Sequence, residues 1–201
     1  MKITSIEMLR QLYPPASGRA AVKTLTALEY HSRRFIERSP FVLLATVDGH
    51  DRLDCSPRGG EPGFVKIIDD GRIIIPDSKG NNRLDSLTNI IETGQIGCLF
   101  LLPGMDETLR LNGHATVNIS PDYLAWYQDQ RNPPKCVIDI EITEVFLHCA
   151  KSLMRSKLWD SSQHIDRTSF ATMGQMLKDQ LNDDGEVETQ EQMIHRYRAQ
   201  L

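Results

Sequence analysis

Two basic side chains stand close together in one short polar segment of the chain. Lys79 and Arg83 flank Asn81, after the apolar run of residues 73–75 and before apolar residues at helical spacing from Leu84 onward. This order indicates a buried strand, a polar loop and the start of a helix. Free backbone N–H groups at a helix start bind anions together with nearby cations, so a phosphate fits this loop. A solvated loop with no ligand has the same composition, and both interpretations stay open from this segment alone.

The helix after this loop is expected to begin near Asn82. Asn82 is a suitable N-cap, and Asp85, three residues later, suits the positive end of a helix dipole. Gly94 is a suitable C-cap. One face of the helix is apolar, and it comprises Leu84, Leu87, Ile90 and Ile91.

No sequence motif for a catalytic or metal site is present. The chain lacks G-x-S-x-G, H-E-x-x-H and P-loop patterns, and its six histidines are scattered. Its four cysteines are widely spaced without a C-x-x-C pair, so we expect reduced, mostly buried thiols and no metal; they are Cys55, Cys98, Cys136 and Cys149. What remains is a set of cations and Gly-rich loops beside strands. This suits a protein that binds an anionic cofactor, which itself performs the chemistry, and we assign no catalytic residue.

The composition is that of an ordinary globular protein. With 201 residues, the chain is long enough for one sizeable core, and we expect a single domain over 1–201. The net charge of −4 argues against nucleic acid or anionic membranes as main partners. No apolar stretch approaches membrane-spanning length, and the first ten residues lack the apolar run of a signal peptide. We therefore expect a cytoplasmic protein.

The remaining pattern predicts short strands joined by turns. Seven strands are expected, at 41–48, 52–56, 64–68, 72–75, 95–102, 107–118 and 136–148. Besides the helix after Asn82, we expect helices at 22–38, from Pro121, at 170–181 and over a turn or two of the last ten residues. The Gly- and Pro-rich segment 57–63 is expected to be a loop. Without regular strand–helix alternation, this order predicts a mainly β fold, an antiparallel barrel with peripheral helices. We divide the chain into an N-terminal arm and helix (1–39), a barrel (40–150) and a C-terminal helical extension (151–201).

The strand expected at 95–102 has apolar residues on both faces. A strand of this kind is covered on both sides. In a small β domain, the second cover is often another subunit, so this strand hints at a dimer.

Four parts of the sequence carry a family resemblance. They are SPRGGEPGFV at 56–65, IPD at 75–77 with GNNRLDSLTNI at 80–90, FLLPG at 100–104 with ETLRLNGHA at 107–115, and HCAKSLMRS at 148–156 with Leu158 and Trp159. Together they resemble the pyridoxamine 5′-phosphate oxidase-like family, the FMN-binding split β-barrel, and within it a subgroup described only as FMN-dependent enzymes. The resemblance runs in order over about residues 20–160 and implies an antiparallel split barrel.

The resemblance also implies cofactor contacts. Arg58 stands where the family has an Arg on the second strand for the ribityl phosphate, and the Ser/Arg/Lys cluster of the next phosphate loop corresponds to Lys79, Asn81 and Arg83. Further positions that resemble flavin contacts are Pro76 and Asp77 beside the isoalloxazine edge, Thr108 on a later strand, and Lys151, Arg155 and Trp159, which in the family approach the flavin from the neighbouring subunit.

The function that this resemblance implies is an FMN-dependent oxidoreductase acting on an unknown small molecule, as a homodimer with flavin at the subunit interface. The oxidase proper carries an Arg-x-His-Arg substrate motif near its end, and residues 160–164 here are Asp-Ser-Ser-Gln-His, so pyridoxamine phosphate is not the expected substrate. One alternative is a split barrel that binds haem, with His148 or His114 as axial ligand, or a deazaflavin. Another is a flavin-binding module without catalysis.

Overall fold

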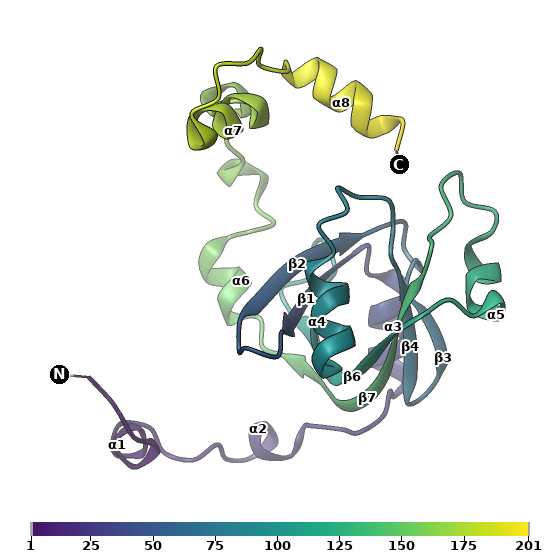
Figure 1. The fold of residues 1–201 in the computed structure, drawn as a ribbon. Helices are drawn as coiled ribbons and strands as arrows, with labels where there is room; N and C mark the ends of the chain where they lie inside the picture. The colour runs from purple at the N-terminus through teal and green to yellow at the C-terminus, as the bar shows by residue number, and fades with distance from the viewer. Residues whose placement is uncertain (1, 201) are drawn as a thin grey trace.

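The computed structural model, which describes residues 2–200, contains one seven-stranded antiparallel sheet that curls around a core (Figure 1). Along the sheet the strands follow the order β2-β1-β5-β6-β7-β4-β3. Their bounds are β1 (Phe41–Val47), β2 (Leu53–Gly59), β3 (Lys66–Asp69), β4 (Arg72–Pro76), β5 (Gln95–Leu101), β6 (Thr108–Asn118) and β7 (Val137–His148). The prediction of an antiparallel split barrel with peripheral helices is confirmed.

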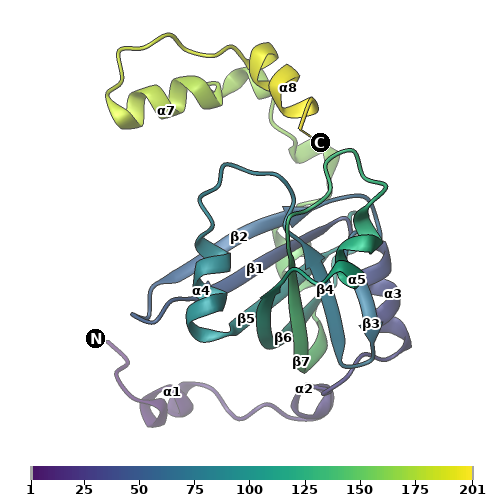
Figure 2. The same ribbon diagram turned by 45° about the vertical axis from the view of Figure 1, so that its right-hand side comes forward.

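The helices lie around and beyond the sheet (Figures 1 and 2). They are α1 (Ile6–Leu12), α2 (Arg19–Val22), α3 (Tyr30–Arg38), α4 (Asp85–Thr93), α5 (Pro121–Leu124), α6 (Lys151–Ser156), α7 (Met173–Leu181) and α8 (Gln190–Arg198), with short 3-10 turns η1 (Ala125–Tyr127), η2 (Ser161–Gln163) and η3 (Arg167–Ser169). None of the helices within residues 2–200 is long and apolar enough to cross a membrane.

The core has two parts on opposite faces of β4. Ile73 and Ile75 join the main cluster inside the barrel, and Ile74 joins a smaller cluster with Tyr127 and Val137 under α5 and η1. All three isoleucines are fully buried, which confirms the buried strand expected before the polar loop. Because this strand is held on both faces, the loop that follows it starts from a rigid position.

A bulge in the longest strand pair curves the sheet. The pairing of β6 with β7 shifts register between Asn112 and Gly113. A Cβ atom at Gly113 would stand 2.2 Å from the carbonyl oxygen of Glu141, so no other residue fits without displacing the backbone. Bulges bend and twist a strand, which helps an antiparallel sheet to close.

Two expected boundaries near the N-terminal side of the barrel are wrong. β2 extends to Gly59, because β1 pairs with it along its whole length, with Val42 opposite Arg58. Pro57 is tolerated because β2 is an edge strand. The helix expected at 22–38 begins only at Tyr30, since Leu25 pairs its backbone with Val145 in a bridge that a helix cannot make.

The other boundaries differ by less. α7 begins at Met173 rather than at 170, because Thr172 caps it by accepting a hydrogen bond from the backbone N–H of Gln175. α8 is nine residues long and occupies most of the last ten residues, as expected. All four cysteines are free, as expected, but only Cys98 and Cys136 are buried, so the expectation that most are buried is wrong.

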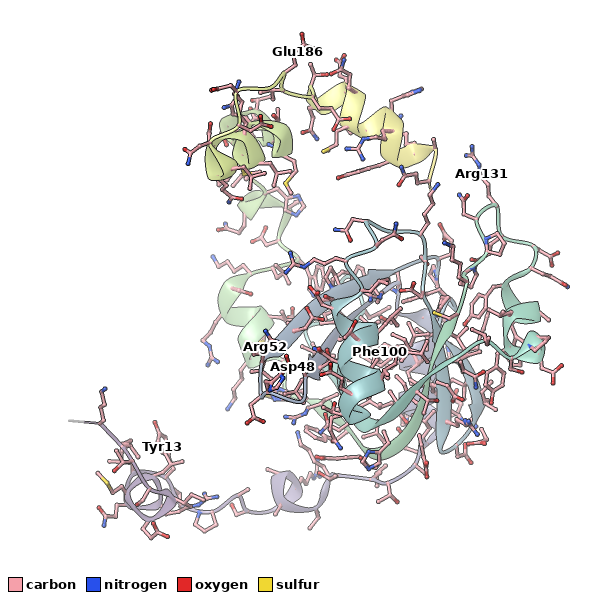
Figure 3. The ribbon with its side chains drawn as sticks, in the orientation of Figure 1. Tyr13, Asp48, Arg52, Phe100, Arg131 and Glu186 are labelled. Atoms are coloured by element: carbon pink, nitrogen blue, oxygen red, sulfur yellow. The ribbon has the colours of Figure 1, made fainter. Side chains whose placement is uncertain are left out.

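The strand expected to be covered on both faces is buried on one. In β5, Ile96, Cys98 and Phe100 point into the core, whereas Leu99 and Leu101 on the other face are half-buried. Figure 3 places Phe100 inside the barrel. The outer face of β5 is therefore apolar and open to solvent in a single chain.

Candidate functional site

A pocket of about 880 Å³ opens where three parts of the chain meet. Its walls are the end of β2, the loop from β4 into α4, and the segment before β7. The lining residues are 56–59, 76–86, 131–133 and 135. The volume lies within the range of about 300–1,000 Å³ that is usual for ligand and cofactor sites.

The pocket is basic although the whole chain is acidic. Five Lys or Arg side chains line it against two Asp, which leaves a net charge of +3, whereas the chain as a whole carries −4. The basic residues are Arg58, Lys79, Arg83, Arg131 and Lys135, and the acids are Asp77 and Asp85. A cleft lined by one sign of charge concentrates ligands of the opposite sign, so this pocket favours an anion.

Arg58 has a buried donor that nothing satisfies. Within residues 2–200, its Nε atom is the buried side-chain nitrogen or oxygen without a hydrogen-bond partner. Its Nη1 donates to the carbonyl of Pro57 at 3.0 Å, and its Nη2 stands 3.9 Å from Oδ1 of Asp77, beyond hydrogen-bond length. Leaving a buried donor unpaired costs about 1–3 kcal/mol. An anion that accepts from this guanidinium would remove that cost.

Asp77 is a half-buried acid within this basic pocket. Its backbone N–H donates to the carbonyl of Cys136 at 3.0 Å, which ties the start of the loop to the segment before β7. Burial raises the pKa of the Asp77 carboxyl, and the nearby charge of Arg58 partly offsets this rise. The residue is therefore held in place by its backbone, while its charge is only weakly compensated by the protein.

The start of α4 has an unusual backbone that leaves it without a side-chain cap. The prediction of Asn82 as N-cap is wrong, because the helix begins at Asp85 and Leu84 stands at the N-cap position. Asn82 and Leu84 both have φ of 59°, a left-handed conformation that is rare for a residue such as Leu. Asn81 instead accepts from the backbone N–H of Arg83 at 3.0 Å. Such strain at a helix start in a pocket is typical of binding sites.

This uncapped helix end adds to the anion site. No side chain hydrogen-bonds to the first turn of α4 as a cap. Its free N–H groups and the helix dipole therefore favour a negative ligand beside Lys79 and Arg83. Arg83 itself is exposed, and its Nε donates to Asp85 at 2.5 Å, an interaction that raises the pKa of the guanidinium.

Buried hydrogen bonds fix the helix start against β2. Ser86 is buried, and its hydroxyl donates to Oδ2 of Asp54 at 2.6 Å. Ser56 donates to the same carboxylate at 3.0 Å. Because Asp54 lies on β2 and Ser86 on α4, the bond between them holds two walls of the pocket at a set separation, and the bond from Ser56 orients the Asp54 carboxylate.

The structure brings together six of the ten cofactor residues expected from the sequence. Those that line the pocket are Arg58, Pro76, Asp77, Lys79, Asn81 and Arg83. The other four do not line it: Thr108, Lys151, Arg155 and Trp159.

These four residues lie elsewhere on the same chain. Thr108 is buried at the start of β6. Lys151 and Arg155 are exposed on α6, and Trp159 donates through Nε1 to the carbonyl of Met105 at 2.8 Å. The contacts that the resemblance implies from the neighbouring subunit for Lys151, Arg155 and Trp159, and the contact implied for Thr108, stay predictions.

Two basic residues of the pocket were missed from the sequence. Arg131 and Lys135 stand in a loop before β7, and Figure 3 shows Arg131 at the outer tip of this loop. The signal was weak, because two bases around Asn132-Pro133-Pro134 look like any exposed turn. The histidines considered as haem ligands, His114 and His148, are both exposed and outside the pocket.

The described residues contain no group of three or more His, Cys, Asp or Glu side chains that is placed to hold a metal ion.

No curated protein matches the chain closely enough to count as a relative. Solved structures do match. HupZ of Group A Streptococcus is 20% identical, with 60% of this chain and 93% of that chain covered and a TM-score of 0.50, and this likeness shows the fold alone.

Other solved structures align with lower TM-scores. A putative pyridoxamine 5′-phosphate oxidase from Lactobacillus delbrueckii is 20% identical, with 62% of this chain and 99% of that chain covered and a TM-score of 0.48. An FMN-binding protein from Syntrophomonas wolfei is 16% identical, with 58% of this chain and 88% of that chain covered and a TM-score of 0.44. The family model described as pyridoxamine 5′-phosphate oxidase matches residues 28–149, which is more than half of the chain and includes every strand. This chain therefore belongs to the pyridoxamine 5′-phosphate oxidase family.

Proposed function

We propose that this protein binds FMN in the pocket between β2 and α4 and is an FMN-dependent oxidoreductase that acts on a small molecule. The observation that carries the proposal is the buried, unpartnered Nε of Arg58 inside a pocket with a net charge of +3. Membership of the pyridoxamine 5′-phosphate oxidase family supports it.

The phosphate of FMN fits the basic end of the pocket. Arg58 offers a guanidinium that can make two parallel hydrogen bonds to phosphate oxygens, and Lys79 adds a point charge. Arg83 and the first-turn N–H groups of α4 complete the set. A dianion held in this way replaces the partner that the buried Nε of Arg58 lacks in the protein alone.

The remaining lining residues suit the ring. When bound, FMN would supply two-electron redox chemistry at this site. Pro76 pairs with Val137 at the start of β7, and the backbone N–H of Asp77 donates to the carbonyl of Cys136, so the two residues form a rigid edge for a flat ligand. The protein's part is to hold and orient the cofactor and to set the charge around it.

We also propose that the working form is a homodimer. The half-buried outer face of β5 supports this, because Leu99 and Leu101 need a cover that one chain does not provide. In a dimer, Lys151, Arg155 and Trp159 would approach the flavin of the other subunit. Without an Arg-x-His-Arg motif, the substrate is a small molecule other than pyridoxamine phosphate.

An anaerobic redox titration tests this function. The purified protein, loaded with FMN, is mixed with NADH, NADPH or dithionite under argon, and the flavin absorbance near the visible maximum is followed before and after air is admitted. An oxidoreductase should bleach with a donor at a useful rate and recover in air. A flavin that only dithionite bleaches would favour a binding module without catalysis. Uptake of a deazaflavin in place of FMN would mean that the cofactor is a deazaflavin and that the proposed FMN is wrong.

A further inference from the structure

Both ends of the chain form arms that leave the barrel. We call residues 2–24 the N-terminal arm and residues 160–200 the C-terminal arm. Their helices α1, α7 and α8 contain no buried residue, and Figures 1 and 2 both show α1 and α7 clear of the sheet at opposite ends of the molecule. Isolated helices of seven to nine residues are marginal in water. These helices therefore need a surface to pack against.

Each arm carries an unpartnered apolar stripe. In α1, Ile6 and Leu9 stand one turn apart with exposed fractions of 71% and 40%. In α7, apolar residues recur every fourth position, and their exposed fractions are 42% for Met173, 42% for Leu177 and 70% for Leu181. This spacing places each set on one face of its helix, which is the pattern of a helix that packs on another body.

The barrel offers a matching uncovered surface on its outer face. Leu43 in β1 stands between Pro57 of β2 and Leu99 of β5 on that face. Leu53 at the edge is 84% exposed. Contiguous apolar surface of this kind on a globular protein marks an interaction site.

The total surface shows how much is left uncovered. The chain exposes 14037 Å². A compact monomer of 22.8 kDa exposes about 9,600 Å². The excess of roughly 4,500 Å² per chain is several times the ~800 Å² that each partner buries in a standard interface, so it leaves ample surface for a second copy to cover.

The two arms are opposite in charge and lie far apart within one chain. The N-terminal arm carries four basic residues and one acid, whereas residues 178–191 of the C-terminal arm carry six acids and one lysine. Figure 3 shows Tyr13 of the N-terminal arm and Glu186 of the C-terminal arm at opposite ends of the molecule. A two-fold axis that passes between the arms would exchange their places, so that each basic arm meets the acidic arm of a second copy.

We propose that two copies of this chain exchange their arms, with the basic N-terminal arm of each protomer packed along the acidic C-terminal arm of the other and the apolar stripes closing over the joined barrels. This inference rests on the homodimer of the proposed function and adds how the dimer is held. The C-terminal arm also contacts the pocket. The carbonyl of Gln200, at the end of this arm, accepts a hydrogen bond of 3.1 Å from the side chain of Asn132 at the pocket rim.

Charge reversal in the full chain distinguishes contacts between copies from contacts within one copy. One variant carries Arg10→Glu with Arg19→Glu in the N-terminal arm. The second carries Asp184→Lys, Glu186→Lys and Glu191→Lys in the C-terminal arm, which makes residues 178–191 net basic. All five positions are exposed. Each variant alone pairs like charges between its two copies, whereas a heterodimer of the two variants restores opposite charges at both arm contacts.

The two variants are co-expressed with different tags, and native mass spectrometry at low salt counts the dimers. If each homodimer is weakened tenfold, the heterodimer fraction rises from the random one-half to about nine-tenths. A control pair with exposed charges outside the arms, Arg38→Glu and Asp122→Lys, should stay at one-half.

Two outcomes would overturn the inference. A heterodimer fraction of one-half for both pairs, with the wild-type protein dimeric, would refute arm exchange and leave the dimer standing. A wild-type protein that is monomeric at micromolar concentration would refute both the exchange and the dimer. Flavin binding is read separately from absorbance, so its failure is not confused with either result.

Discussion

Replacing Arg58 by Met tests the phosphate site most sharply. Met keeps most of the length and the apolar stem of the side chain, while it removes the charge and the unsatisfied Nε donor. Hydrogen bonds to a charged group contribute about 1.5–3 kcal/mol each. Each such bond lost to the phosphate weakens FMN binding by roughly 10- to 150-fold, so Arg58→Met should weaken it by at least that factor.

The assay compares two ligands that differ only in the phosphate. Ligand-free protein is titrated with FMN and with riboflavin, and quenching of flavin fluorescence gives each dissociation constant. Arg58→Met should weaken FMN binding by the factor above and leave riboflavin binding within about twofold, since riboflavin has no phosphate for the guanidinium to bind. The matched control is Arg38→Met, an exposed arginine on α3 outside the pocket, which should change neither constant.

The reasoning fails if the variant loses affinity for both ligands equally. Arg58 would then support the pocket wall or the ring rather than the phosphate. Circular dichroism and thermal unfolding of the ligand-free variant show whether it is folded. Because the substitution also removes a buried unpaired donor, the ligand-free variant should not lose stability by more than two interactions contribute: the hydrogen bond to the Pro57 carbonyl and the weak 3.9 Å interaction with Asp77.

Three further predictions follow from the pocket and the sheet. Because the pKa of Asp77 is raised in the folded protein, ionisation of its carboxyl lowers the stability of the folded state as pH rises from the ordinary value of 3.8 through the raised pKa. Asp77→Asn should therefore increase the melting temperature of ligand-free protein at pH 7, and this gain should vanish below pH 3.8. A gain that persists at low pH would contradict this prediction. Gly113→Ala should cost about 1–3 kcal/mol in urea unfolding, because its Cβ would meet the Glu141 carbonyl, whereas Gly49→Ala should be nearly neutral; equal effects of the two would argue against the bulge as a strict constraint. Ser86→Ala should also lower stability by about 1–3 kcal/mol, since it removes a hydrogen bond to the half-buried Asp54 carboxylate, which then keeps only its bonds from Ser56; no change in the urea midpoint would mean that water replaces the hydroxyl.

The sequence predicted those features of the fold that depend on local pattern. The run Ile73-Ile74-Ile75 indicated a buried strand, and the structure confirms it and shows burial on both faces. The number and order of the strands followed from turn signals such as Asp48-Gly49 and Asp70-Gly71. These signals are short-range, and no distant contact overrides them here.

The boundaries that were wrong depend on distant contacts. β2 continues through Pro57 to Gly59 because β1 pairs with it along its full length, although Pro and Gly signal a loop locally. Residues 23–29 are not helical, because Leu25 bridges to Val145, more than a hundred residues away. The left-handed Leu84 has no local signature at all, since Leu disfavours that conformation.

The candidate site shows the same division. Lys79 and Arg83 were identifiable because a strand, a polar loop and a helix follow one another in the sequence. Arg131 and Lys135 were not identifiable, because only the packing of the segment before β7 against the β4–α4 loop brings them to the pocket. The placement of Arg58 came from the family resemblance, and the unpaired state of its Nε is visible only in three dimensions.

Identification of the bound chromophore tests the central claim most directly. The purified protein is scanned in the visible range and denatured by heat, and the released compound is identified by chromatography and mass spectrometry. We predict flavin absorbance and the release of FMN at about one per chain, either as purified or after incubation with FMN. A Soret band, or a colourless protein that takes up no FMN, would contradict the proposal.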